Sequence, residues 1–130
     1  MEALKLDYLT ELGAGDNEFI IEMLQTYIDE TGTDMHALES SLNEGNLKRI
    51  GFLAHRCKAA FRILGLEKMV VDAENLEQGV KIENAEASAF EEPVKALIEG
   101  IKDSLVQAKN CILQLSNQEL KNNAHSSTSS

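Results

Sequence analysis

The chain has 130 residues, a formal net charge of −10 and a sequence pI near 4.7. This length fits one domain, and so acidic a balance disfavours nucleic acid and anionic membranes as partners. One proline, no tryptophan and no long β-branched run favour an all-α fold. No apolar run is long enough for a membrane span, and the N-terminus lacks the pattern of a secretory signal, so we expect a cytoplasmic protein.

Periodic apolar residues predict six helices, two of them short. In chain order they fall at residues 4–12, 16–30, 34–43, 46–64, 67–81 and 91–115. We expect the run Thr31-Gly32-Thr33 to break the chain between the second and third helices. Short connections favour antiparallel neighbours, so the sequence predicts an antiparallel four-helix bundle with two additional short N-terminal helices.

The helix at 46–64 carries the residue of greatest chemical interest. Its apolar stripe predicts a buried face, formed by Ile50, Leu53, Cys57, Phe61 and Leu64. His55 points away from that stripe, with Phe52, Lys58 and Ala59 one turn away and Arg62 two turns on. A nitrogen nucleophile with open approach and nearby positive charge suits an incoming phosphoryl group.

Gly51 lies one turn before His55, inside the same predicted helix. Glycine in a helix interior costs about 1 kcal/mol relative to alanine. Its presence there indicates a close approach, either by another protein or by a neighbouring helix.

Other catalytic patterns are absent from the sequence. There is no glycine-rich phosphate loop and no serine-nucleophile motif. No His-x-x-x-His or Cys-x-x-Cys pair exists, so we expect no metal site and no cofactor of the protein's own. Cys57 and Cys111 fall on predicted core stripes, which favours buried free thiols over a disulfide.

Five short motifs follow one another along the chain: Leu6-Asp7-Tyr8-Leu9, Gly15-Asp16-Asn17-Glu18-Phe19, Ala54-His55-Arg56-Cys57-Lys58-Ala59-Ala60, Leu64-Gly65-Leu66 and Asn75-Leu76-Glu77. Together they resemble the histidine phosphotransfer (HPt) domain of multistep phosphorelays. The resemblance covers about residues 4–115. It implies an HPt domain at residues 1–116, followed by a flexible C-terminal tail at 117–130.

The resemblance implies that His55 accepts a phosphoryl group and that Lys58 assists it. The protein would then be a carrier without an ATP site, not an enzyme, which takes the group from a receiver-domain aspartate and passes it to another receiver. The implied partners are response-regulator receivers, which would bring Mg²⁺, and a hybrid sensor kinase.

Ala59 stands where the family usually has glycine, so we expect slowed transfer of the phosphoryl group. We expect a monomer.

Two further site predictions concern neighbours of His55. A receiver is expected to dock on a surface containing Phe52, His55, Ala59 and Arg62. Antiparallel helices joined at Gly65 bring Glu77 to the height of His55, where its carboxylate can accept a hydrogen bond from one imidazole nitrogen and leave the other free for attack.

Two other functions remain open from the residues. One is a helical interaction module that binds a receiver or kinase domain without phosphorylation. The other is a metal-binding bundle, which the lack of inward Glu-x-x-His pairs disfavours.

Overall fold

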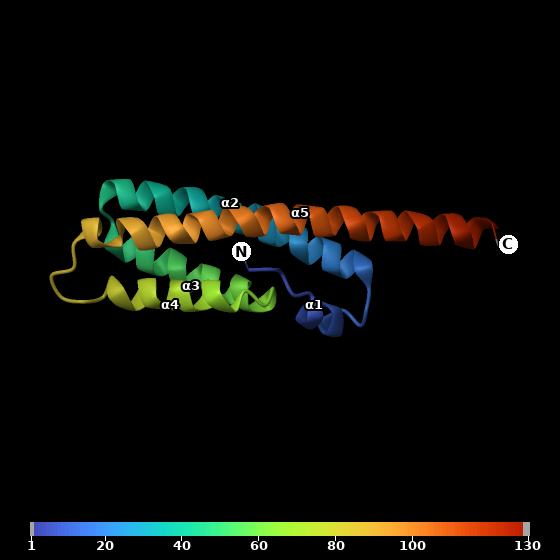
Figure 1. Ribbon diagram of the computed structural model, residues 1–130, viewed down its shortest axis with the longest axis horizontal. Helices are drawn as coiled ribbons and strands as arrows, with labels where there is room; N and C mark the ends of the chain where they lie inside the picture. Colours follow the sequence, from blue (N-terminus) through green and yellow to red (C-terminus); the bar gives the residue numbers. More distant parts are fainter. Residues whose placement is uncertain (1, 129–130) are drawn as a thin grey trace.

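The computed structural model describes the backbone of residues 2–128 and the side chains of residues 2–122 (Figure 1). Its helices are α1 (Asp7–Leu12), α2 (Asn17–Glu44), α3 (Leu47–Ile63), α4 (Glu67–Gly79), the short 3₁₀ helix η1 (Ala87–Phe90) and α5 (Glu91–Thr128). Within the described backbone there is no strand, which confirms the all-α prediction. None of the described helices is both long and apolar enough to span a membrane.

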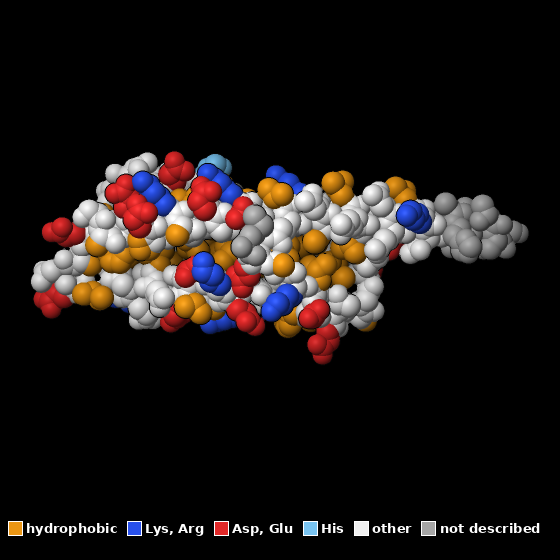
Figure 2. Space-filling model, in the orientation of Figure 1, with side chains coloured by type: hydrophobic (Ala, Val, Ile, Leu, Met, Phe, Trp, Pro, Cys, Tyr) orange, Lys and Arg blue, Asp and Glu red, His pale blue; other side chains and the backbone are white. Residues whose placement is uncertain are grey.

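Four helices form an antiparallel bundle. α2 packs along α5 and α3 along α4, while contacts of α2 with α3 and of α4 with α5 close the arrangement (Figure 1). α3 and α5 therefore lie diagonally opposite each other. On the face shown in Figure 2, acidic side chains are scattered among lysines and arginines, and hydrophobic side chains are visible between them.

The expected break at residues 31–33 is wrong, because α2 runs unbroken from Asn17 to Glu44. Thr31 is 2% exposed and continues the buried stripe that includes Leu24, Tyr27, Met35 and Leu38. A glycine with ordinary helical φ weakens a helix by only about 1 kcal/mol, and burial of the surrounding face outweighs that cost. One short N-terminal helix, α1, therefore remains in place of two.

The last helix is longer than the sequence predicts. α5 continues past residue 116 to Thr128, with no break at the expected domain boundary. Gln118 accepts a hydrogen bond of 3.4 Å from Asn17 at the start of α2, so the bundle reaches at least this far. Residues 129–130 of the expected tail lie outside the described residues, and the division into domain and flexible tail stays a prediction.

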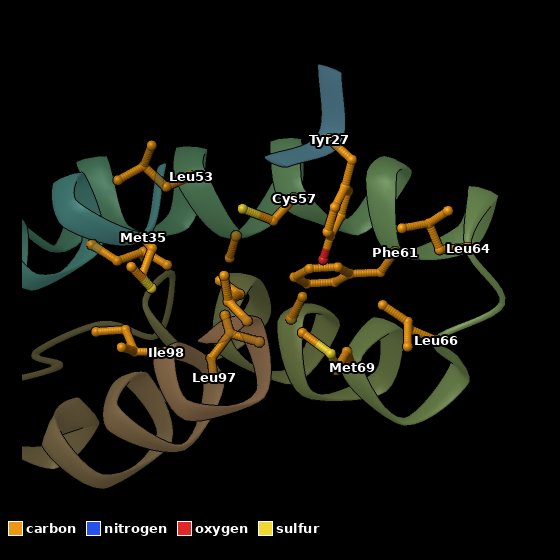
Figure 3. Close-up of a cluster of buried hydrophobic side chains, with 14 of the residues drawn as sticks. Tyr27, Met35, Leu53, Cys57, Phe61, Leu64, Leu66, Met69, Leu97 and Ile98 are labelled. Carbon is orange, nitrogen blue, oxygen red and sulfur yellow. The ribbon is translucent and has the colours of Figure 1, made fainter. Parts of the chain in front are cut away.

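The core is centred on aromatic and aliphatic side chains from all four bundle helices. Phe61, fully buried on α3, lies near Tyr27 of α2 and Met69 of α4 (Figure 3). The Ser104 hydroxyl donates to the carbonyl of Ile101 at 2.7 Å, so the Tyr27 hydroxyl donates to Ser104 Oγ at 2.6 Å. This hydrogen bond satisfies both buried hydroxyls and fixes α2 against α5.

Candidate functional site

Defined turns hold both ends of α3, the helix that carries His55. At its start, the Asn46 side chain accepts from the Arg49 amide at 3.1 Å, which caps the helix. At its end, Gly65 has φ +65°, a left-handed conformation that glycine adopts at low cost. The backbone of Lys5 also donates to the carbonyl of Leu64 at 2.9 Å, which fastens the N-terminal segment to this end.

The expected buried stripe of α3 is confirmed. Its members are at most 2% exposed, and they are Ile50, Leu53, Cys57, Phe61 and Leu64. With that face in the core, the opposite face is presented to solvent, and the side chain of His55 is 66% exposed.

His55 and Glu77 meet across the α3–α4 contact. The imidazole Nδ1 lies 2.8 Å from Glu77 Oε1. Among the described residues, no hydrogen-bond partner contacts the other ring nitrogen, Nε2. The structure thus shows the contact expected from the similar distances of the two residues from Gly65, with His55 ten residues before it and Glu77 twelve residues after it.

Lys58 is buried, although the sequence placed it on the exposed face beside His55. Only 9% of Lys58 is exposed, and its ammonium group lies 2.9 Å from Glu77 Oε2 and also contacts Glu74. Because an aliphatic stem can follow the helix surface, the lysine reaches α4 from a position at the edge of the core. The cluster of Lys58, Glu74 and Glu77 joins α3 to α4 directly beneath His55.

The cluster controls the charge of Glu77. Hydrogen bonding from Lys58, with a smaller contribution from His55, holds the pKa of Glu77 below its usual range against the opposing effect of burial. The same carboxylates raise the pKa of Lys58, with Glu74 contributing most. Glu77 is therefore an anion at neutral pH, and an anion can only accept a hydrogen bond from His55.

An open hollow lies beside the imidazole. Its lining comprises Lys48, Gly51, Phe52, His55, Glu77, Val80 and Lys81. Sequence reasoning had not included Lys48 or Lys81, although each lies on the same helical face as a predicted site residue. Lys81 Nζ is 3.8 Å from Glu77 Oε1. The hollow therefore has apolar lining from Phe52 and Val80 and two lysines, Lys48 and Lys81, at its margin.

Gly51 is explained by the neighbouring helix, the second of the two alternatives. Gly51 is buried, and a Cβ atom built on it would lie 2.8 Å from Val80 Cγ2 at the end of α4. The absence of a side chain lets α3 and α4 approach closely just where His55 meets Glu77.

We expect Gly51→Ala to lower the free energy of unfolding, as measured by urea denaturation. Overpacking a tight contact costs about 1–3 kcal/mol, which exceeds the gain of about 1 kcal/mol in helix propensity. Gly32→Ala is the matched control, because a Cβ there meets Leu105 Cδ1 at an ordinary 3.9 Å. That variant gains the propensity alone and should be more stable than the parent. Equal stabilisation by both changes would show that Val80 moves aside freely.

The other predicted docking residues lie on the exposed side of α3. Phe52 is 59% exposed, and Ala59 and Arg62 are also exposed, although only Phe52 lines the hollow. The Arg56 guanidinium lies 5.4 Å from the centre of the Phe52 ring, within the range of a cation–π contact.

Asp34 is a further residue that sequence reasoning missed. It is 4% exposed on α2, and its carboxylate accepts two hydrogen bonds from Arg56, one of them 3.1 Å long. An acidic residue on the core stripe of an amphipathic helix was the available signal, because a buried carboxylate requires a partner. The ion pair raises the pKa of Arg56 and secures α2 to α3 next to Phe52.

Both cysteines are free thiols, as predicted, but only Cys57 is fully buried. Burial, together with the nearby Asp34 carboxylate, raises the pKa of Cys57 to about 12. The thiol is thus protonated and unreactive. Within the part of the chain that the structure describes, no group of three or more potential ligands could hold a metal ion.

A family model, described as the Hpt domain, matches residues 22–123. The chain belongs to the Hpt domain family. The match covers α3 and α4 completely and most of α2 and α5 of this Hpt domain, and it includes His55, Lys58 and Glu77. Hpt domains take part in histidine-containing phosphotransfer in phosphorelays. Comparison with curated proteins and with solved structures gave no match.

Proposed function

We propose that this Hpt domain accepts a phosphoryl group on Nε2 of His55 from the aspartyl phosphate of a receiver domain and passes it to a second receiver. The observation that carries the proposal is the contact of Nδ1 with Glu77. An ionised Glu77 requires a proton on Nδ1, so the exposed Nε2 holds the lone pair.

The transfer step follows from this arrangement. The Nε2 lone pair attacks phosphorus, a P–N bond forms, and the bond between phosphorus and the receiver's aspartate oxygen breaks, leaving a carboxylate. The ring becomes positively charged, and its Nδ1–H remains hydrogen-bonded to the Glu77 anion, which stabilises that charge. In the transfer to a second receiver, the P–N bond breaks and a new bond forms between phosphorus and an aspartate oxygen of that receiver.

Lys58 acts through Glu77 in this proposal. Its ammonium group is already engaged by two carboxylates, so it fixes the position of Glu77 and is a positioning residue. The remaining catalytic groups, including Mg²⁺, would come from the receiver, and the domain itself would need no cofactor. A receiver and a hybrid sensor kinase would be its partners, in the cytoplasm.

The proposal is tested by incubating the protein with a phosphorylated receiver and measuring its intact mass. We expect a gain of one phosphoryl group that is lost in acid and retained in base, as for a phosphohistidine. A receiver that binds without any mass gain would support a non-phosphorylated interaction module instead.

We expect Phe52→Ala to weaken receiver binding roughly tenfold, because a large exposed apolar side chain beside His55 is suited to the centre of an interface. The melting temperature should change little, since the ring is mostly exposed. Titration calorimetry with the receiver measures the first effect and thermal unfolding the second. Val71→Ala is a matched control, because Val71 is 56% exposed on α4 and does not line the hollow beside His55. A large loss of stability with unchanged binding would contradict the assignment of Phe52 to the interface.

A further inference from the structure

The outward face of α5 changes character halfway along the helix. In its first half this face carries charged residues, among them Glu92, Lys95, Glu99 and Lys102. From Val106 onward the face carries apolar residues alternating with asparagines: Val106, Asn110, Leu113, Asn117 and Leu120. We call these five residues the α5 seam.

The α5 seam is exposed and turned away from the core. Val106, Leu113 and Leu120 are 58%, 63% and 66% exposed, and both asparagines are also exposed. At about 100° per residue, the centre of the α5 seam lies roughly 160° from Ala108, which is fully buried. Three large aliphatic side chains along one line of a helix are an unpartnered apolar face.

The spacing of the α5 seam is that of a coiled coil. Its residues follow one another at intervals of four, three, four and three, which places the aliphatic residues at d positions and the asparagines at a positions of a heptad. Aliphatic residues at d together with a polar asparagine at a favour two parallel strands in one register, because each amide then meets the same amide of the other strand.

We propose that the α5 seam is the interface of a parallel homodimer, in which the α5 helices of two copies of this chain pair along it. A second copy is the occupant that supplies an asparagine opposite each asparagine. A helix with aliphatic residues at those positions would leave the buried amides without partners.

Charge favours the same occupant. The chain as a whole carries −10, which opposes self-association, but residues 105–122 contain two lysines and one glutamate. No member of the α5 seam is charged. In Figure 2 the part of α5 beyond the bundle likewise shows few charged side chains before the grey atoms begin. The electrostatic repulsion between two copies is therefore smallest along this stretch.

The proposed dimer leaves His55 of each copy accessible to a partner. α3 lies diagonally across the bundle from α5, so pairing through the α5 seam covers neither His55 nor the hollow beside it. A dimer replaces the monomer expected from the sequence, and it is independent of whether His55 is phosphorylated. Because two heptads form a short coiled coil, we expect association to depend on concentration.

Sedimentation velocity of the full chain, from low-micromolar to near-millimolar concentration, tests the dimer. The mean mass should rise toward that of two copies, and Val106→Glu should hold it at one copy. Val71→Glu is the matched control, because Val71 is 56% exposed on α4 and outside the α5 seam, and it should behave as the parent. A parent that stays monomeric, or equal effects of the two variants, would overturn the proposal.

Strand direction is tested with Asn117→Cys in a Cys111→Ser background. Under mild oxidation, a parallel dimer brings the two introduced thiols together and should give a disulfide-linked dimer. Dimerisation without this cross-link would overturn the parallel α5 seam. Phosphoryl acceptance by Val106→Glu should equal that of the parent, so failure of this proposal and failure of the His55 proposal are distinguishable.

Discussion

His55→Gln should abolish phosphoryl acceptance. Glutamine is close to histidine in size and can still hydrogen-bond to Glu77, but its amide nitrogen has no basic lone pair with which to attack phosphorus. The side chain is 66% exposed, and its loss removes no core contact, so the fold should be unaffected. Intact-mass measurement after incubation with a phosphorylated receiver should show no gain above background.

His36→Gln is the matched control for this experiment. His36 is exposed on α2, within the same molecule, so its replacement removes a histidine without touching the α3–α4 site. It should accept the phosphoryl group at the parent rate. Acceptance by His55→Gln near the parent level, with an unchanged circular dichroism spectrum, would remove His55 from the reaction.

Glu77→Ala should slow phosphotransfer roughly 10- to 100-fold, the size of effect that follows loss of a partner that orients a metal-binding histidine. Without the carboxylate, the proton is no longer held on Nδ1, and part of the population carries it on the nucleophilic Nε2. Nitrogen NMR of the imidazole measures the tautomer directly and should show a smaller share with Nδ1–H. Single-turnover phosphotransfer measures the rate.

Two companion variants separate orientation of the ring from general loss of structure. Glu77→Gln retains a carbonyl that can accept from Nδ1–H, so it should recover much of the rate. Glu74→Gln alters the same cluster at Lys58 without contacting His55, and it should leave the tautomer unchanged. An identical tautomer population in Glu77→Ala and the parent would exclude the proposed contact.

The helical nature of the elements and the buried face of each helix were largely predictable, because burial follows local periodicity. The stripe of α3 and the meeting of His55 with Glu77 required only the positions of two helices joined by a short turn at Gly65. The continuous α2 was not predicted, since Thr31-Gly32-Thr33 has the composition of a break, and only packing against α5 and α3 shows that it is helical.

The interior of the site depended on contacts that periodicity does not encode. Lys58 could face solvent or α4 with equal local plausibility, and two carboxylates on another helix decide its direction. The pairing of Asp34 with Arg56 joins residues 22 positions apart in different helices. Such pairs need the relative rotation of α2, α3 and α4, which a single sequence does not supply.

The chain of contacts from Asp34 through Arg56 to Phe52 affects the entropy of any association at this surface. Ordering a mobile interface side chain costs about 0.5–1.5 kcal/mol when a partner binds. Here a carboxylate anchored in the core holds the guanidinium, and the guanidinium lies against the aromatic ring. Much of the rotational freedom of Arg56 and Phe52 is therefore lost when the bundle folds, and a partner that covers the ring loses correspondingly less on binding.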